Sequence, residues 1–436
     1  MDCSKSNIMK RLVIDNIGPI KHVELNLKRV NVIIGPQSVG KSCVLKIACF
    51  CAWAEKRIQL EQGKNGFDDF NYIEENLLEF HKLEGFVEKG KKARFEYKTD
   101  HIRFVCDFDS RTFDYSWTAG HWKYKRSRIS YIPAERNIVA VVPNWLDVKI
   151  GFTNIRSFIS DWDMARKMYN AKKQLEILDL GVRYYYDQQT GKDVIALPTG
   201  QPIDLSNASS GLQSVIPMWT YLDFLFKSQY SEKVASDLAT ESENEDVLNH
   251  IYDNKFKKGL RKLMDSGGQA YIGKIGMGKR PFVSEEAYKE CKQLVDAYTK
   301  TQSSDIYLEE PEQNLFPLTQ MELVYELLEN AGVHGDSLFV TTHSPYILYA
   351  LNNCMLGGLV ERKIPKENEA LRKRAQSWIS PKEVSVWEMR EGELSSGIDE
   401  KYYTIQDEDG LIRSNYFDRI MKLVMTDFSN YSNYYE

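Results

Sequence analysis

Short apolar runs separated by turns occupy the first 34 residues of the chain, and a long apolar stretch follows them. Leu12–Ile14 form an apolar patch, "HVELNL" alternates between polar and apolar residues, and "VNVII" is continuously apolar. Alternation is typical of a strand with one buried face, and a short apolar run is typical of a central strand. The pattern therefore predicts paired strands over residues 11–34. After Lys41 the apolar residues fall on several faces of a helix, which predicts a helix covered on more than one side.

The middle of the chain is predicted to contain strands first and helices afterwards. Residues 91–132 hold the alternating, aromatic-rich segments "ARFEYKT", "IRFVCDF", "TFDYSW" and "ISYIP", with the basic and aromatic turn "TAGHWKYKRSR" before the last of them. Residues 154–180 have a helical pattern, and the turn "QQTG" between "VRYYYD" and "DVIALP" predicts a hairpin. A further helix is predicted to begin near Ser210.

The segment 229–302 differs from its surroundings in the distribution of its charges. It opens with the acidic "ESENED", turns basic at "KFKKGLRK" and contains the Gly-rich "GGQAYIGKIGMGKR". We interpret it as an insertion that is partly helical and partly a mobile loop. The strand "DIYLEE", a helix over 318–331, the strand "SLFVTT" and a helix beginning at "SPYIL" follow it. The remaining residues contain one more predicted strand, "EVSVWEMREGEL", and one more predicted helix, "YFDRIMKLVMTDF". The whole pattern indicates an α/β fold.

Composition and charge narrow the choice of protein class. Of the 436 residues, 42% are hydrophobic and 27% charged, which is ordinary for a globular protein, and the net charge of −5 does not indicate a strongly cationic DNA-binding body. A local basic patch stays compatible with this charge. The sequence has no 18-residue apolar run and no signal-peptide layout, so we expect a soluble, cytoplasmic protein that does not bind a membrane. Seven cysteines without a CxxC pair are expected to be reduced and mostly buried.

The segment Gly35–Ser42, "GPQSVGKS", fits the pattern G-x-x-x-x-G-K-[ST] and lies between a predicted strand and a predicted helix. Its glycines let backbone N–H groups turn toward phosphate oxygens, and the helix N-terminus adds partial positive charge. Lys41 would reach the β and γ phosphates, and the Ser42 hydroxyl would ligate Mg²⁺. A chance match occurs in roughly 1–2% of chains of this length. The predicted nucleotide-binding residues of this loop are Gly35, Pro36, Gln37, Ser38, Val39, Gly40, Lys41, Ser42 and Cys43.

Two adjacent carboxylates, Glu309 and Glu310, follow the apolar segment "IYL". A phosphate loop needs an acidic partner on a neighbouring strand, because both the metal and the attacking water require one. We expect Glu309 to hold Mg²⁺ through its water shell. Glu310, just beyond the strand, would polarise the water that attacks the γ-phosphate. The alternative is a surface acidic turn, since "EEPE" alone is unremarkable.

Two further segments are informative in combination with the phosphate loop and the two carboxylates. His343 follows the apolar strand "LFVTT", and the carboxyl ends of parallel strands meet at one edge of a sheet, where ligands bind. A histidine there could contact the γ-phosphate and the attacking water, although a lone histidine is more often structural. The segment "LSNASSGLQS" at 205–214 is small and polar and opens a helix, so by itself it predicts only a helix cap.

In this order the four motifs resemble those of ABC-type ATPases of the SMC/RecF/OLD group. "RLVIDNIGPIKHVELNLKRVNVIIGPQSVGKS" is similar to the group's N-terminal strands and Walker A loop, "SSGLQS" to its signature motif, "YLEEPEQNLFP" to its Walker B, and "FVTTHSPYIL" to its His switch. "YIPAERN" at 131–137 resembles a segment of small OLD-like, AAA-annotated anti-phage defence ATPases of the PARIS and Septu type. The resemblance implies a P-loop NTPase fold with a mixed N-terminal β-sheet, a central, mostly parallel sheet flanked by helices, and a helical insertion. It covers roughly residues 8–55, 130–137, 203–228 and 303–352.

The same resemblance implies a role for each matching residue. Glu310 would be the catalytic carboxylate and His343 the switch residue, with Ser42 and Glu309 serving Mg²⁺. Ser209 and Gly211 would contact the γ-phosphate of an ATP molecule held by a second copy, which implies a head-to-tail homodimer or a higher oligomer. The sequence departs from the pattern at three positions. Ser210 stands where the relatives commonly carry Gly, Leu212 where they carry Gln or Glu, and Asn314 where they often carry His.

The expected organisation divides the ATPase core into two parts. Residues 1–228 would carry Walker A, a β-rich subdomain and the signature, and residues 303–360 would carry Walker B and the His switch. The helical insertion would occupy 229–302, and an α/β tail 361–436.

Two function hypotheses follow from these motifs. In the first, a magnesium-dependent ATPase, whose turnover need not be fast, regulates or scaffolds a separate effector encoded nearby, a nuclease or toxin, in an anti-phage system. In the alternative, a RecF/SMC-like ATPase binds DNA in repair, with "HWKYKRSR" and "KFKKGLRK" as candidate contacts. Both charge runs are also compatible with a solvated surface. A transporter subunit fits poorly, because the group resembled is not the transporter branch.

Overall fold

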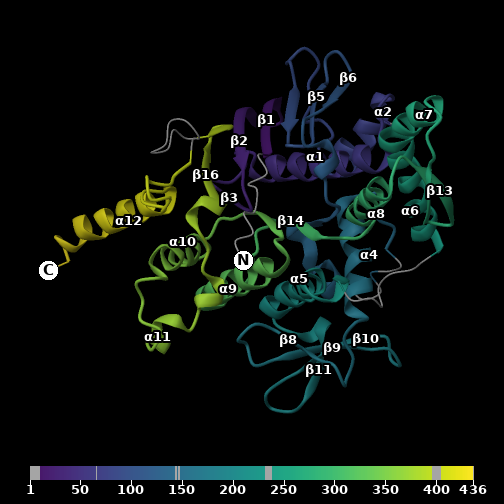
Figure 1. Ribbon diagram of the computed structural model, residues 1–436. Coiled ribbons are helices and arrows are strands. Elements are labelled where there is room, and N and C mark those ends of the chain that lie inside the picture. Colours follow the sequence, from purple (N-terminus) through teal and green to yellow (C-terminus); the bar gives the residue numbers. More distant parts are fainter. Residues whose placement is uncertain are drawn as a thin grey trace.

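One eleven-stranded sheet runs through the molecule, in the strand order β6-β5-β4-β1-β2-β17-β16-β3-β15-β14-β7 (Figure 1). The computed structural model describes residues 10–64, 66–142, 145, 148–230, 238–394 and 404–435, and the side chains of 238–242 are not described. Cys3 lies outside these ranges. The strands of the large sheet are β1 (Lys10–Ile17), β2 (Ile20–Leu27), β3 (Val30–Ile34), β4 (Arg94–Lys98), β5 (Ile102–Asp107), β6 (Thr112–Trp117), β7 (Ser127–Ile132), β14 (Ser303–Glu309), β15 (Ser337–Thr341), β16 (Val384–Arg390) and β17 (Glu393–Leu394).

The five strands at one end of this sheet are parallel to one another. β3 pairs with β15 and with β16, and β14 pairs with β15 and with β7, all in parallel register. Their carboxyl ends therefore lie along one edge. The other strands, β1, β2, β4, β5 and β6, pair in antiparallel register, and short β17 joins the two parts by pairing with β16 and β2. The predicted α/β class, with a mixed N-terminal sheet and a mostly parallel central sheet, is confirmed.

Helices cover both faces of the sheet. α1 (Lys41–Glu61) packs in one apolar core with β1, β2 and β4–β6, while α4 (Asn154–Arg166), α5 (Ser210–Phe226), α9 (Pro317–His334) and α10 (Pro345–Val360) pack in another core on the opposite face. Successive side chains of β3 point to the two cores in turn, since Val32 and Ile34 belong to the second core and Ile33 to the first. α1 is enclosed between the antiparallel strands and the parallel sheet, as its apolar pattern predicted.

Residues between β7 and β14 add two small units. The strands β8 (Leu175–Glu176), β9 (Arg183–Asp187), β10 (Lys192–Ala196) and β11 (Pro202–Asp204) form a four-stranded sheet. The helices α6 (Leu238–Ile251), α7 (Lys257–Asp265) and α8 (Glu285–Thr299) pack with the hairpin β12 (Tyr271–Ile275) and β13 (Gly278–Phe282) around a third apolar cluster. The described chain also contains three short helices, α2 (Phe70–Ile73), α3 (Ile138–Val141) and α11 (Glu369–Arg372).

Two local predictions from the sequence were wrong. The helix predicted over 154–180 ends at Arg166, and residues 175–176 form a strand instead. The insertion 229–302 was predicted as part helical and part mobile loop, but its Gly-rich segment forms the β12–β13 hairpin, in which Gly276 takes a positive φ of 60° at the turn. Glycine supplies that turn conformation without steric cost, so its abundance marked a tight turn rather than an unstructured loop.

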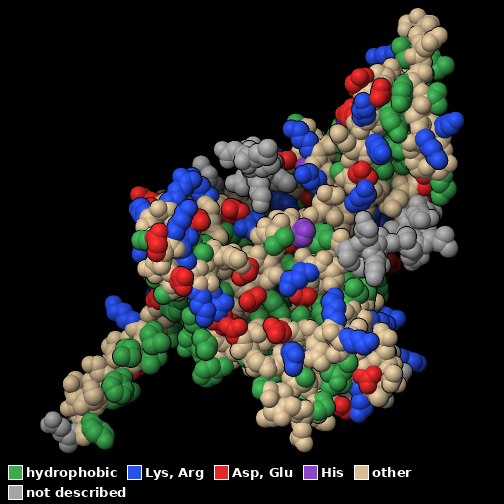
Figure 2. Space-filling view, turned by 60° about the horizontal axis from the view of Figure 1, so that its bottom comes forward, with side chains coloured by type: hydrophobic (Ala, Val, Ile, Leu, Met, Phe, Trp, Pro, Cys, Tyr) green, Lys and Arg blue, Asp and Glu red, His purple; other side chains and the backbone are tan. Residues whose placement is uncertain are grey.

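The last helix, α12 (Tyr416–Ser432), projects from the body with apolar side chains over its outer turns (Figure 2). Its only described contacts outside the helix are near its first turn, where Tyr349 donates to Asp418 over 2.6 Å and Arg419 pairs with Glu388. No helix among the described residues is long and apolar enough to cross a membrane. Six cysteines are described, and all are buried free thiols, as expected.

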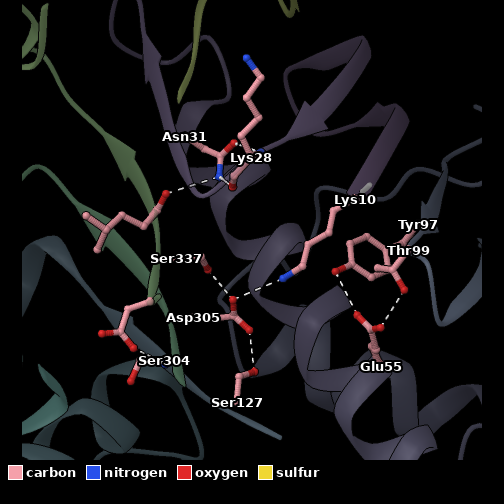
Figure 3. Close-up of polar contacts among 12 residues, drawn as sticks. Lys10, Lys28, Asn31, Glu55, Tyr97, Thr99, Ser127, Ser304, Asp305 and Ser337 are labelled. Carbon is pink, nitrogen blue, oxygen red and sulfur yellow. Dashed lines mark hydrogen bonds and ion pairs between the residues drawn. The ribbon is translucent and has the colours of Figure 1, made fainter. Parts of the chain in front are cut away.

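A buried polar cluster fixes the amino end of β14 (Figure 3). The Asp305 carboxylate accepts hydrogen bonds from Lys10 at 3.3 Å, from Ser127 at 2.6 Å and from Ser337. These partners come from β1, β7 and β15, so one carboxylate ties three strands to β14. Burial would raise the pKa of Asp305, but Lys10 and the two hydroxyls outweigh it and hold that pKa below its usual value.

Candidate nucleotide-binding site

The loop Gly35–Gly40 connects the carboxyl end of β3 to the first turn of α1. Gly35 has a φ of 145°, and a Cβ atom there would lie 2.3 Å from the Met389 carbonyl oxygen of β16. Gly40 has a φ of 106°, which favours glycine, and Ser38 has a φ of 63°. The two fixed glycines of the motif are thus required by close approach and by backbone conformation. Gly40 offers no side-chain cap, so the first N–H groups of α1 stay unsatisfied by any capping side chain.

Lys41 turns its ammonium group back into this loop. Its Nζ donates to the carbonyl oxygens of Gly35 at 3.0 Å and Pro36 at 2.6 Å. Burial lowers the pKa of Lys41 to about 8, although the carboxylates of Glu310 and Glu312 counteract part of that shift. A buried ammonium held by carbonyl oxygens alone is well suited to receive an anion.

The neighbouring loop residues divide between solvent and core. Gln37 and Ser38 are exposed, whereas Pro36, Val39 and Ser42 are half-buried. Cys43 is buried, and its Sγ faces the Ile17 carbonyl oxygen at 4.0 Å. Its side chain therefore belongs to the core, and only its backbone N–H remains a candidate for a phosphate contact.

The two predicted carboxylates leave the end of β14 in different directions. Glu309 is buried, and its Oε2 accepts a hydrogen bond from the Ala134 backbone N–H at 3.2 Å. Glu310 has a φ of 41°, a left-handed conformation that is uncommon for a residue other than glycine, and its N–H donates to the Thr341 carbonyl at 2.9 Å. This turn in the backbone directs the Glu310 carboxylate away from the strand and toward the loop after β15.

His343 lies opposite Glu310. Its Nε2 is 3.5 Å from Glu310 Oε1, and its backbone N–H donates to Glu312 Oε1 at 2.6 Å. The His343 ring, followed by the charges of Lys41 and Arg136, lowers the pKa of Glu310, so that its carboxyl group is ionised at neutral pH. Burial raises the pKa of Glu312, whose Oε2 has no hydrogen-bond partner among the described residues.

Ser209 and Gly211 lie at the start of α5, on the face of the sheet opposite α1. Ser209 is exposed and caps the helix by accepting a hydrogen bond from the Leu212 N–H at 3.5 Å. A Cβ atom at Gly211 would lie 3.0 Å from the Asn314 carbonyl oxygen, so the signature segment packs against the loop after β14. Within the described chain, Ser209 forms no hydrogen bond with Lys41, Glu310 or His343. The structure brings the other predicted residues to one edge and leaves Ser209 facing solvent.

Two residues at this edge were not singled out from the sequence. Arg136, which follows β7, is completely buried and donates to the carbonyl oxygens of Glu309 and Glu310. Glu312 orients the His343 backbone. The segment "YIPAERN" offered one signal, since an arginine directly after an apolar strand in a parallel sheet lies at the ligand edge.

No family model and no curated protein matches the sequence. Solved structures are similar over most of the chain at low identity. The SMC head domain from Thermotoga maritima is 10% identical, with a TM-score of 0.34, over 79% of this chain and 92% of that chain. The recombination mediator RecF with ATP is 9% identical, with a TM-score of 0.31, over 91% of this chain and 99% of that one. A bacterial ABC transporter cassette, MJ0796, is 10% identical, with a TM-score of 0.28, over 88% of this chain and 96% of that one.

Proposed function

We propose that this chain is an ABC-type ATPase that binds ATP with Mg²⁺ and hydrolyses it in a site shared by two copies of the chain. The observation that carries the proposal is the meeting of four motif residues at one sheet edge: Lys41 in its loop, Glu309 and Glu310 at the end of β14, and His343 after β15. These residues are far apart in the sequence. Their convergence has no structural explanation as economical as a shared ligand.

The residues at the edge fit a nucleoside triphosphate and a divalent cation. The loop has the glycines that close backbone approach requires, and Lys41 supplies a buried positive charge. Ser42 and Glu309 are oxygen ligands of the kind Mg²⁺ prefers, and this ion commonly completes its shell with phosphate oxygens and water. When bound, the magnesium nucleotide would supply the γ-phosphoryl group for transfer to water.

The chain's own side chains would act on the water and on the charge of the phosphates. Glu310 is ionised and partly exposed, so it can accept a hydrogen bond from a water molecule and orient it. His343 is close enough to share that water. Lys41 would exchange its carbonyl partners for phosphate oxygens, a stronger, charge-assisted interaction.

The exposed position of Ser209, with half-buried Gly211 two residues further on, supports a second copy as part of the site. In a head-to-tail pair these residues would face the nucleotide held by the partner. Apolar side chains close to them are also exposed, with Phe316 76% and Leu318 61% accessible. Such side chains directly beside a polar ligand site are typical of an interface.

The experiment measures ATP turnover and mass in solution together. Wild-type protein should hydrolyse ATP in the presence of Mg²⁺, and the Glu310→Gln variant should bind ATP, fail to hydrolyse it and accumulate as a dimer by light scattering. Turnover at the wild-type rate by this variant would remove Glu310 from the catalytic role. A wild-type protein that neither binds nor hydrolyses ATP would overturn the proposal.

We further propose that ATP-dependent closure controls a separate effector, a nuclease or toxin of an anti-phage system. This finer part is supported by the resemblance of "YIPAERN" and the four motifs to defence ATPases. Reconstitution with the product of the adjacent gene tests it. The effector's activity should depend on ATP and disappear with Lys41→Ala, whereas an effector that is equally active without this chain would contradict it.

A second candidate, DNA binding in the manner of a repair ATPase, is favoured by one observation. The two basic segments noted in the sequence meet in the structure, where Lys255 lies 5.2 Å from the Trp122 ring centroid and both border a cavity of about 350 Å³ together with Lys123. Stacking on an aromatic ring beside lysines suits single-stranded nucleic acid. Lys123→Glu with Lys255→Glu should reduce salt-sensitive DNA affinity, and unchanged affinity would remove this support.

A further inference from the structure

Arg136 is buried at the end of the strand that neighbours β14. β7 and β14 run parallel, with Ile132 opposite Leu308, so the chain leaves β7 next to the Walker B carboxylates. Pro133 ends the strand, and a 3₁₀ turn over Ala134–Asn137 carries the arginine back across the end of β14. Arg136 is 0% exposed, although arginine is almost never fully buried without partners.

The guanidinium group of Arg136 binds backbone rather than side chains. Its Nη1 donates to the Glu309 carbonyl oxygen at 2.8 Å and to the Pro133 carbonyl oxygen at 3.2 Å. Its Nη2 donates to the Glu310 carbonyl oxygen at 2.7 Å. Carbonyls at the end of a strand lose their ladder partners, and a planar fork with several donors can satisfy two successive ones. A lysine, with a single ammonium group, cannot reproduce that geometry.

The backbone held in this way is the strained one. Glu310 has a φ of 41°, a left-handed backbone conformation that is sterically strained for residues other than glycine. The Glu310 peptide is fixed on one side by Arg136 and on the other by the hydrogen bond from its N–H to the Thr341 carbonyl. With both sides fixed, the direction of the Glu310 side chain toward His343 is fixed as well.

The charge of Arg136 is balanced by the site itself. Burial lowers the pKa of Arg136 to about 10, and the carboxylates of Glu312, Glu310 and Glu309 oppose that shift. The arginine therefore stays protonated at neutral pH. The opposing carboxylates include those of Glu310 and Glu309, whose backbone carbonyls Arg136 holds, so the site itself neutralises this buried cation.

We propose that Arg136 is a positioning residue, whose guanidinium clamps the Glu309 and Glu310 carbonyls so that the Glu310 carboxylate stays directed at His343. This inference rests on the proposed function for its effect on turnover, but the clamp itself is a property of the protein without nucleotide. The same clamp acts on Glu309, so both predicted Walker B side chains depend on one arginine that follows a different strand.

Arg136→Lys tests the clamp, with Arg128→Lys as the matched control. Arg128 lies on β7 too, but it pairs with Asp161 at 2.9 Å and stacks on the Phe224 ring, away from the ligand edge. Hydrogen exchange of the nucleotide-free protein should show the Glu310 amide exchanging about 10-fold faster in Arg136→Lys and unchanged in Arg128→Lys. A displaced catalytic group lowers turnover by up to about 100-fold, so kcat should fall about 10–100-fold while ATP affinity changes less than about 3-fold.

The two readouts separate the possible failures. Unchanged exchange at Glu310 in Arg136→Lys would overturn the clamp, whatever the turnover. A loss of kcat that merely follows the unfolded fraction in thermal melts, and is matched by Arg128→Lys, would also overturn it. If wild-type protein shows no ATP turnover, the proposed function fails, and the exchange of the Glu310 amide still decides the role of Arg136. Arg136→Gln serves as the second variant where Arg136→Lys does not fold.

Discussion

The two ends of β14 carry carboxylates in opposite situations. At the amino end, Asp305 is buried and has three partners, Lys10, Ser127 and Ser337, which lower its pKa (Figure 3). At the carboxyl end, Glu310 has a strained backbone and is partly exposed, and its one ion-pair partner among the described residues is His343, at 3.5 Å. Only three residues of one strand, Ile306, Tyr307 and Leu308, separate Asp305 from Glu309.

The difference teaches how burial and pairing distinguish a structural carboxylate from a candidate catalytic one. A carboxylate whose oxygens are all satisfied by its own chain has no capacity left for a ligand. One that is ionised, strained and incompletely paired keeps that capacity, and strained backbone concentrates at functional sites. We therefore expect substitutions at the amino end to affect stability, and those at the carboxyl end to affect chemistry.

The largest effect is expected at Asp305. Replacing it with Asn leaves Lys10 without its buried partner, and breaking a buried ion pair costs about 3–5 kcal/mol. The free energy of unfolding, measured by urea denaturation, should fall by that amount, while kcat of the folded protein stays within about 2-fold. A stability loss below about 1 kcal/mol would mean that the amino end is not the structural end of this strand.

The acid dependence of stability gives a second measure of the same carboxylate. The pKa of Asp305 is lower in the folded chain than the unfolded value of about 3.9. Its contribution is therefore fully present above the unfolded pKa and is lost as the pH falls below it. Between pH 5 and pH 3, wild-type protein should lose more unfolding free energy than Asp305→Asn, and equal losses would contradict the assigned pairing.

Glu310→Gln tests the other end of the strand. The amide keeps the size of the side chain but cannot accept a proton from water, so kcat should fall at least about 100-fold, or ~2.7 kcal/mol in activation free energy. The melting temperature should stay the same or rise, because the substitution breaks no structural ion pair. If Glu310→Gln unfolds as easily as Asp305→Asn, both ends are structural and the comparison fails.

Two lysines extend the comparison. Lys10 pairs with Asp305 and has a raised pKa, whereas Lys41 is held by two carbonyls and has a pKa lowered to about 8. Lys41→Ala should weaken ATP binding about 10–100-fold, or ~1.4–2.7 kcal/mol, in a fluorescent-nucleotide titration. Lys46→Ala, further along α1, is the matched control and should leave affinity unchanged.

Local patterns in the sequence account for much of this architecture but not for its long-range pairings. The strands around the loop were predictable because "VNVII", "DIYL" and "SLFVTT" are short apolar runs bounded by polar residues. The place of β16 directly beside β3 was not, because residues 354 positions apart form this pair and no local pattern specifies the partner. Arg136 shows the same limit, since an arginine in sequence indicates surface and only the folded chain reveals its carbonyl partners.

The smallest effects are expected at Ser209. Substitutions there test whether a second copy of the chain contributes to the site at the carboxyl end of β14. Its hydroxyl caps α5 over a long 3.5 Å hydrogen bond, so Ser209→Ala should cost about 0.5–1 kcal/mol of stability.

Ser209→Arg keeps the fold but adds bulk at the exposed start of α5, and it should prevent ATP-dependent dimers in a Glu310→Gln background while leaving nucleotide affinity within about 3-fold. Ser206→Arg, exposed on the preceding turn, is the control for added charge. Because Ser209 forms no hydrogen bond with the Lys41 loop among the described residues of its own chain, a loss of dimers with retained binding can arise only through the partner copy. Dimers that form equally well in Ser209→Arg would place the second copy elsewhere.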